Sequence, residues 1–273
     1  MRATFLAPAL LCVVSAEAQT LRQFTASRPH RSEARLDVTV SFPRGTLRVG
    51  PAPAGVLYAV DATYDPSRYA PVAAFDASGL TAGLVPASAI RIAAVSQPAE
   101  EGLVRLSPDV DVALAVEVAG AEARLDLGGL RLTSLRFEGE GSQSVLRFAS
   151  PNRALCTEAE ITVTGGTLDV QGFGNSGCRT LRLRGGVGRV NLDFAGDLPA
   201  AVSADLAVTV GELVLRVPRG VGVRLTSDRF LAGLDVPGLM RSGNAWVSPD
   251  YDTARRKVEL RVASTVGSVK IEH

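Results

Sequence analysis

Apolar and polar residues alternate along much of the second half of the chain, which is the pattern of strands with one buried and one solvated face. The alternation predicts strands over residues 167–170, 180–184, 189–194, 205–210, 212–217, 222–227, 257–262 and 268–271. Their apolar members are expected to face a common core: Leu168, Val170, Leu181, Leu183, Val190, Leu192, Phe194, Leu206, Val208, Val210, Leu213, Leu215, Val217, Val223, Leu225, Val258, Leu260, Val262, Val269 and Ile271. The polar residues between them are expected to face solvent.

These strands recur at a nearly constant step. Equivalent apolar positions are assigned 20 to 23 residues apart, at Leu125, Val145, Leu168, Val190, Leu213 and Leu234. Glycines, which allow tight corners, come shortly before five of them: Gly141, Gly166, Gly188, Gly211 and Gly233. Such a step is typical of a solenoid, in which stacked units share one core. We therefore predict an all-β fold, a β-solenoid or stacked-strand protein with coils of about 22 residues.

The stretch from Val210 to Phe230 contains two alternating runs, which fit either a lone hairpin or part of a solenoid. The repeat favours one coil, with Pro218–Val221 as its corner, because proline cannot donate to a strand ladder. Residues 237–256 are then an inserted loop in the last coil. The end of that coil, residues 268–273, is expected to be an open edge that invites capping or self-association.

The beginning of the chain differs in character. A short apolar segment followed by Ala16-Glu17-Ala18 predicts a signal peptide over residues 1–18, and therefore an exported, periplasmic or extracellular protein. The apolar segment is shorter than the roughly 20 residues that span a bilayer, so no transmembrane helix is expected in the mature chain. Residues 19–34 are interpreted as a polar linker or extended lead-in.

Residues 35–120 are interpreted as a less regular, β-rich N-terminal region, and residues 121–273 as the regular solenoid. Strands in the first region are predicted at 35–41, 46–49, 56–63, 104–106 and 112–118. Between them, the Ala-, Pro- and Gly-rich stretch 70–98 fits a short helix and a loop equally well.

Composition restricts the classes of partner. A formal net charge of +1 argues against general attraction to nucleic acid or to an acidic membrane surface. Removal of the signal peptide leaves two cysteines, Cys156 and Cys178, which are one coil apart. Equivalent positions on stacked strands are close enough for a disulfide, so the spacing fits a bond between them and, equally, two buried free thiols.

Motifs that often carry catalysis or cofactor binding give weak signals. Residues 172–177 match G-x-G-x-x-G, but alternating residues follow instead of a helix, so we interpret them as a turn rather than a dinucleotide site. The two histidines, His30 and His273, lie near the chain ends, where a catalytic triad or zinc site lacks partners. We therefore assign no catalytic residue, cofactor or metal site.

Charged residues offer two further candidates. The acid pairs Asp109/Asp111, Glu138/Glu140 and Asp250/Asp252 are interpreted as solvated strand faces. The last pair flanks Tyr251 near Trp246, so we treat Trp246, Asp250, Tyr251 and Asp252 as a weak surface-site candidate; the alternative is a loop packed onto the solenoid by Trp246. Outward arginines form either a stripe for an anion or, as we favour, interleaved charges that confer solubility: Arg131, Arg136, Arg182, Arg184 and Arg224.

Three segments carry a family resemblance: GGVGRVNLDFAGD, GELVLRVPRGVGVRL and GNAWVSPDYDTARRKVELRVASTVGSVKIE. They resemble the toast-rack domain of LiaF-like bacterial cell-envelope proteins, over about residues 120–273 and more weakly over 35–120. The resemblance implies a stacked β architecture and a role in envelope-stress response or assembly. Members of that family often carry N-terminal membrane helices and regulate a sensor kinase, whereas this chain begins with a predicted signal peptide. Related adhesins with solenoid folds are a neighbouring family.

The sequence thus predicts a non-enzymatic exported protein of the cell envelope with an interaction, scaffold or envelope-stress role, whose partner is a protein or another envelope component. Two alternatives remain open. One is a surface adhesin that binds a glycan or a protein. The other is a carbohydrate-active enzyme on a β-helix, which requires an aromatic-lined groove with closely spaced carboxylates.

Overall fold

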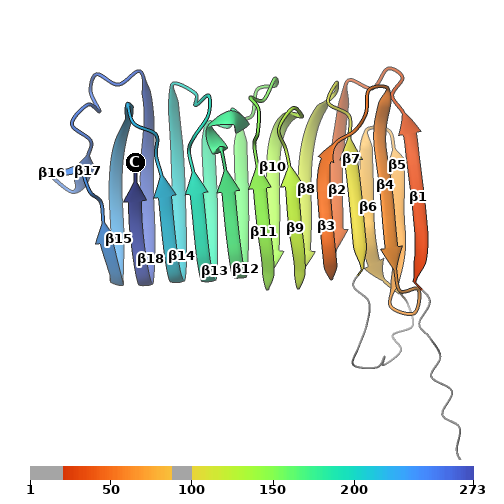
Figure 1. The fold of residues 1–273 in the computed structure, drawn as a ribbon. Coiled ribbons are helices and arrows are strands. Elements are labelled where there is room, and N and C mark those ends of the chain that lie inside the picture. The colour runs from red at the N-terminus through yellow and green to blue at the C-terminus, as the bar shows by residue number, and fades with distance from the viewer. Residues whose placement is uncertain (1–20, 88–99) are drawn as a thin grey trace, which may run out of the picture.

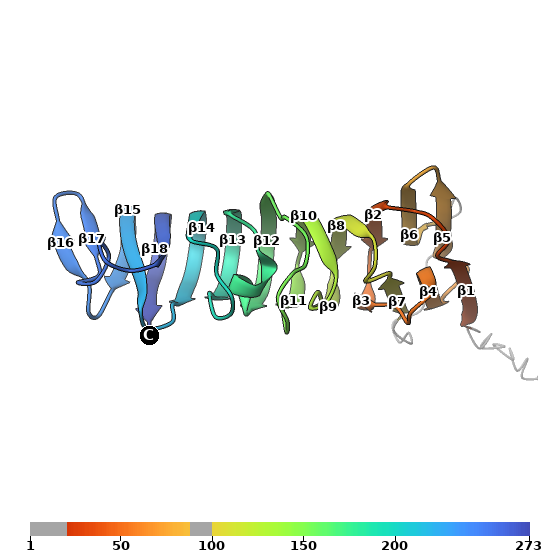
Figure 2. The same cartoon turned by 90° about the horizontal axis from the view of Figure 1, so that it is seen from above.

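The computed structural model describes residues 21–87 and 100–273 (Figure 1), so the predicted signal peptide lies outside the described residues. Strands make up most of the described chain. They form one hydrogen-bonded network that folds into two facing layers, as the view from above shows (Figure 2). The prediction of an all-β, stacked-strand fold is confirmed.

In the C-terminal half, a single long strand bends from one layer into the other. We call each such pass through both layers a rung, with a first leg before the bend and a second leg after it. These rungs are β12 (Glu158–Gln171), β13 (Thr180–Asp193), β14 (Ala201–Arg216), β15 (Val221–Asp235) and β18 (Arg256–Glu272). Leu168 pairs with Val190, and Val190 with Leu213, at steps of 22 and 23 residues, which confirms the predicted period.

Nearer the N-terminus, each rung consists of two separate strands, one for each leg. In the order of the stack the rungs are β6 (Gly79–Pro86) with β7 (Glu101–Leu106), β2 (Arg35–Phe42) with β3 (Gly45–Pro51), β8 (Asp111–Ala119) with β9 (Ala121–Asp126), and β10 (Arg131–Glu140) with β11 (Ser142–Arg147). The boundary suggested between residues 120 and 121 falls at the bend of the β8/β9 rung. One core cluster extends along both halves.

Strands at the N-terminal end of the stack run antiparallel to the rungs. β4 (Val56–Tyr64) pairs with β7, β1 (Arg22–Pro29) pairs with β4, and β5 (Tyr69–Asp76) pairs with β6. Two expectations are therefore corrected. Part of the polar lead-in 19–34 is strand β1, and within 70–98 the described residues form the β5–β6 hairpin instead of a helix or loop. These are end strands whose side chains are mostly half-buried or exposed, so alternation is weak and pairing decides the structure. Residues 88–99 lie outside the described part.

At the C-terminal end of the stack, the order of the strands in space differs from their order in the sequence. β18 pairs with β14 on one side and β15 on the other, so residues 268–273 do not form an open edge, and that prediction is wrong. The chain leaves β15, forms the short strands β16 (Met240–Ser242) and β17 (Ala245–Val247), and returns to fill the gap between two earlier rungs. The stretch Val210–Phe230 thus joins two rungs that β18 separates, with Pro218–Val221 as the turn between them.

A column of glycines forms the bend of the continuous rungs: Gly166, Gly188, Gly211 and Gly267, paired in register. All four have positive φ, and a Cβ added to each would lie within 2.0 Å of a backbone oxygen of the preceding rung. Only glycine fits both conditions. Gly233 lies outside this column, because Ala232 is the residue that pairs with Gly267.

Almost all the residues expected to face the core are buried, with Val210 as the exception at 38% exposure. Val210 lies at the bend, where the inward and outward sides exchange. Two assigned repeat positions are also shifted: Ser144, not Val145, pairs with Leu168, and Ala123, not Leu125, pairs with Ser144. Ser142 and Ser144 occupy the inward positions there, with their hydroxyl oxygens 3.0 Å apart. Because two polar residues are buried on this strand, the alternation of apolar and polar residues in its sequence does not identify the inward face.

Candidate functional site

A hollow of about 640 Å³ lies on the outer face of the second legs in the N-terminal half of the stack. It crosses β7, β3, β9 and β11 and reaches the end of β12. We call it the basic groove, because its lining includes one acid, Asp126, and four arginines: Arg48, Arg105, Arg124 and Arg147. Leu103, Val145 and Pro51 contribute apolar surface.

Strand alternation places the four arginines on one outer face. Each stands between two apolar residues, as Arg48 does between Leu47 and Val49, both of which are buried. Parallel pairing then aligns the rungs, so that Arg48 lies opposite Leu103 on one side and Arg124 on the other. Gly50, opposite Arg105, has no side chain, and a Cβ there would have its nearest contact at 3.7 Å. The absent side chain therefore leaves room in the floor of the groove.

The groove arginines differ in how their charge is balanced. Arg105 donates to Asp61 at 2.6 Å, and Arg124 pairs with Glu122 on its own strand. Arg48 and Arg147 are exposed and have no hydrogen bond or ion pair with a residue in the described ranges. The Nε of Arg105 is also buried with no partner in those ranges. The groove thus has more positive charge, and more unused donors, than the chain itself satisfies.

The outward arginines singled out from the sequence lie on the other layer, on first legs. There Arg131 pairs with Asp111 at 2.8 Å, and Arg184 with Asp205 at 3.3 Å. Arg136 lies 3.7 Å from Glu160, and Arg182 pairs with Glu158. Arg224 packs over the ring of Tyr251. Opposite charges therefore interleave between rungs, as expected for a solvated face, and these five arginines do not form an unbalanced stripe.

A second hollow, of about 340 Å³, adjoins the basic groove and bears on the enzyme alternative. Its lining contains an aromatic side chain, Phe24, and two acids, Asp61 and Glu101. Asp61 accepts hydrogen bonds from Arg105 on one carboxylate oxygen and from Thr25 on the other, at 2.6 and 3.0 Å. Both of its oxygens are therefore engaged in structural contacts, which leaves Glu101 without a free acid partner in that lining.

The candidate cluster in the insertion lies at the C-terminal end of the stack. Trp246 is in β17, opposite Leu225 of β15, and is partly buried against the core. Tyr251 is buried and donates to Glu259 at 2.9 Å; burial raises the pKa of Tyr251, and this hydrogen bond raises it further. Asp250 accepts backbone hydrogen bonds through its carbonyl, and the carbonyl of Asp252 lies 3.4 Å from the Lys257 ammonium. These contacts attach the insertion to the stack.

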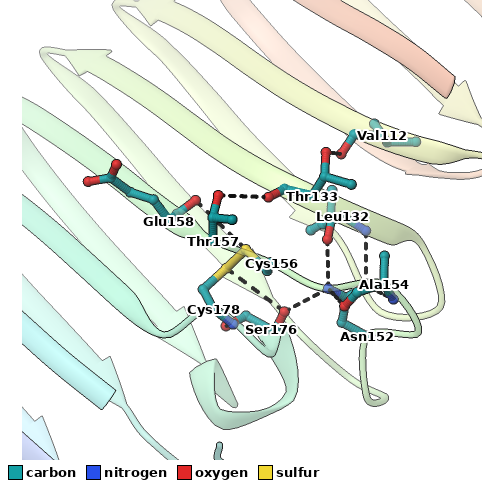
Figure 3. Close-up of a disulfide and its surroundings, with 10 residues drawn as sticks. All are labelled: Val112, Leu132, Thr133, Asn152, Ala154, Cys156, Thr157, Glu158, Ser176 and Cys178. Carbon is teal, nitrogen blue, oxygen red and sulfur yellow. Dashed lines mark hydrogen bonds between the residues drawn. A yellow bond between two sulfur atoms is a disulfide. The ribbon is translucent and has the colours of Figure 1, made fainter. Parts of the chain in front are cut away.

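Cys156 and Cys178 lie just before β12 and β13, on adjacent rungs (Figure 3). Their sulfurs are bonded in the structure, and their Cα atoms are 4.3 Å apart. Beside them, the side-chain amide of Asn152 donates to the carbonyls of Leu132 and Ser176, at 2.8 and 2.9 Å (Figure 3). This side chain links β10 to the turn between β12 and β13, a role that the sequence pattern did not predict.

The remaining motifs have structural roles. Residues 172–177 contain the short 3₁₀ helix Phe173–Ser176 between two glycines of positive φ, which agrees with the interpretation as a turn. Phe173 packs edge-to-face between Phe148 and Phe194, so the turn contributes to the core. His30 hydrogen-bonds with the carbonyl of Glu33 at 3.0 Å. Within residues 21–87 and 100–273, no group of three metal-ligating side chains could hold an ion.

The basic groove was not predicted, although the sequence contains a signal for it. Each groove arginine occupies the outward position of an apolar-Arg-apolar triplet on a second leg. The signal becomes visible only when the legs are aligned, and β3 and β7 are separated in sequence by β4, β5 and β6. Among the described residues, no helix is long and apolar enough to cross a membrane.

No protein-family model and no curated protein matches the chain. Solved structures with a similar course include a "putative cell adhesion protein" from Clostridium sporogenes, at 13% identity and a TM-score of 0.49, with 92% of this chain and 99% of the other covered. Another is a "putative adhesin" from Bacteroides fragilis, at 12% identity and a TM-score of 0.45, with 93% and 99% covered. At these identities and scores the similarity carries no argument about function, and the LiaF-like resemblance gains no support from it.

Proposed function

We propose that this chain is an exported, non-enzymatic binding protein of the cell surface or envelope, which acts as an adhesin through the outer faces of its rungs. The observation that supports the proposal most is the basic groove, where four arginines meet one acid, Asp126, and where Arg48 and Arg147 form no ion pair or hydrogen bond with a described residue. On the first legs of the same stack, by contrast, Arg131 and Arg184 are paired with acids of neighbouring rungs. Unbalanced charge over a hollow is typical of a surface that awaits a partner.

The architecture suits binding because it holds that surface rigid. Parallel hydrogen bonding fixes each rung to its neighbours, and side chains from both layers pack into one core. A surface that is already in place has less entropy to lose on association than a mobile loop has. The groove therefore combines free charge with preorganised geometry, which favours recognition over a catalytic role.

A protein–protein scaffold role is a second candidate, supported by a different feature. Apolar side chains are exposed in register along the bend: Val187, Val210, Val266 and Leu231, next to Phe230. Phe230 and Leu231 are 78% and 67% exposed. Aligned apolar residues of this kind are typical of protein contact surfaces. The second leg of β15 has no pairing strand on its outer side among the described residues, so self-association through this edge remains part of the proposal.

The test is a binding measurement on cell-envelope material. The fluorescently labelled exported chain is mixed with intact bacterial cells and with isolated envelope fractions, and bound fluorescence is followed with increasing protein. Saturable binding, without release of new reducing ends from the material, is the expected result. Absence of saturable binding would contradict the adhesin proposal, and release of reducing ends would favour the carbohydrate-active enzyme instead.

A further inference from the structure

We propose that the basic groove binds a segment of an anionic polysaccharide, with acidic groups of the chain held by arginines of successive rungs. This inference rests on the proposed function and names its ligand class and its site. Arg105, Arg48, Arg124 and Arg147 come from four consecutive second legs, β7, β3, β9 and β11. Neighbouring rungs are about 4.8 Å apart, close to the length of one sugar in an extended polysaccharide. A charged polymer lying across the rungs can therefore meet a new cation at each step.

The chemistry of the cations specifies acidic groups. A guanidinium presents several N–H donors in one plane and binds a carboxylate or sulfate through two hydrogen bonds at once. Arg48 and Arg147 have all of these donors available, because no described residue accepts from them. Arg105 uses one nitrogen for Asp61 and leaves its Nε without a partner. An acidic ligand would satisfy donors that the folded chain leaves free.

The floor of the groove suits sugar rings between the charges. Gly50 leaves an opening beside Arg105, and Leu103 and Val145 give half-buried apolar surface on the two sides of Arg48 and Arg124. Pyranose rings have C–H faces that pack on aliphatic side chains, while their acidic substituents point to the rim. The combination of a small aliphatic floor and a cationic rim thus matches a carboxylated or sulfated sugar.

Two other anionic macromolecules fit less well. Single-stranded nucleic acid is usually held by aromatic side chains on which bases stack, and the residues that line the groove include none. An acidic peptide that adds to a sheet needs an open strand edge, whereas the groove lies on the face of paired strands. A polysaccharide is therefore the occupant that the lining favours, and the other two become outcomes of the test.

The test compares matched variants of the exported chain. The groove variant carries Arg48→Gln and Arg147→Gln, neither of which removes a hydrogen bond or an ion pair with a described residue. The control variant carries Arg189→Gln and Arg216→Gln, the same charge change on second legs of β13 and β14. Calorimetry is performed with polygalacturonate, dextran sulfate, neutral dextran, polyglutamate and single-stranded DNA, and circular dichroism verifies that each variant is folded.

We expect the unmodified chain to bind polygalacturonate or dextran sulfate but not neutral dextran, with affinity lost in about 1 M salt, where the Debye length is about 3 Å. The groove variant should bind at least roughly tenfold more weakly, and the control variant should bind as the unmodified chain does. The two acidic polysaccharides distinguish carboxylate from sulfate recognition. The inference is wrong if neither binds, if both variants lose affinity equally, or if polyglutamate or DNA binds as tightly. If envelope material binds both variants equally, the proposed function stands and the groove assignment fails.

Discussion

The two halves of the stack build the same kind of rung in different ways. From β12 onward each rung is one bent strand, with a glycine at the bend in every one of them except β15, whereas β8 with β9, and β10 with β11, are separate strands. The two halves also differ in how the arginines on their second legs are paired. On the C-terminal second legs Arg189 pairs with Glu212 at 2.8 Å, and Arg216 with Glu272 at 3.1 Å. On the N-terminal second legs, Arg48 and Arg147 are unpaired within the described chain.

The difference indicates that the C-terminal half mainly stabilises the stack, whereas the N-terminal half provides the surface that we propose for binding. Where successive rungs repeat closely, Arg189 and Arg216 fall opposite acids of the neighbouring rungs and pair with them. Where β7, β3 and β9 come together from distant parts of the chain, Arg48 falls opposite Arg124 and Leu103 instead of an acid, Gly50 has no side chain, and a hollow results. Functional surface in this fold is therefore expected where the repeat is least regular.

The largest effect is expected at the bend of a continuous rung. Gly211→Ala places a Cβ about 1.8 Å from the carbonyl oxygen of Gly188, at a residue with a φ of 142°. Relief requires displacement of one rung from the next, so we expect a loss of more than about 4 kcal/mol in unfolding free energy, or no folded protein. Urea denaturation followed by circular dichroism measures it.

Gly233→Ala is the matched control, because its added Cβ has its nearest contact at 3.8 Å, and the residue lies on the edge strand β15. Its stability should change by less than about 0.5 kcal/mol. Equal losses in the two variants would show that the glycine column does not determine the bend.

The disulfide should give the next largest effect, since it joins the first two continuous rungs. Cys178→Ser opens a loop of 22 residues between the bonded positions and is expected to lower the unfolding free energy by about 2–4 kcal/mol. Mass analysis of the unreduced chain should show no alkylatable thiol at Cys156 or Cys178, and a reducing agent should lower the melting temperature of the unmodified chain only. Two labelled thiols in the native protein would contradict the bond.

In the regular half the sequence was sufficient for the period and for the buried face of each strand, and the reasons lie in particular residues. Leu168, Val190 and Leu213 repeat with their glycines, so one alignment identifies both the period and the buried face. The same reasoning failed at Ser142 and Ser144, where a buried hydroxyl pair takes the place of apolar residues. It failed also at β18, because alternation describes which side of a strand is buried but not which strands are neighbours.

The candidate site was harder to predict because alternation does not show which strands are neighbours. Arg48, Arg105 and Arg124 are far apart in sequence and become neighbours only through the order β7, β3, β9. The sequence directed attention to Trp246 and Tyr251 because they are adjacent along the chain. In the structure, their contacts attach an insertion to the end of the stack. A site built across rungs requires the stacking order, which composition and periodicity do not contain.

The smallest effect tests the charge balance itself. A hydrogen bond from Lys270, and a second, less influential one from Arg216, hold the pKa of Glu272 below its ordinary value of 4.5. Because the pKa is lower in the folded state, this contribution to stability is complete above pH 4.5 and is lost as the pH falls through the folded-state pKa. Arg216→Gln should raise the pKa of Glu272, as observed by NMR titration of its carboxyl carbon, and should slightly lower stability at neutral pH but not at low pH.

Arg48→Gln, in the groove, is the control and should change neither the pKa of Glu272 nor the stability. If Arg48→Gln alters stability as much as Arg216→Gln does, then Arg48 has a partner in solution and the contrast between the two halves is wrong.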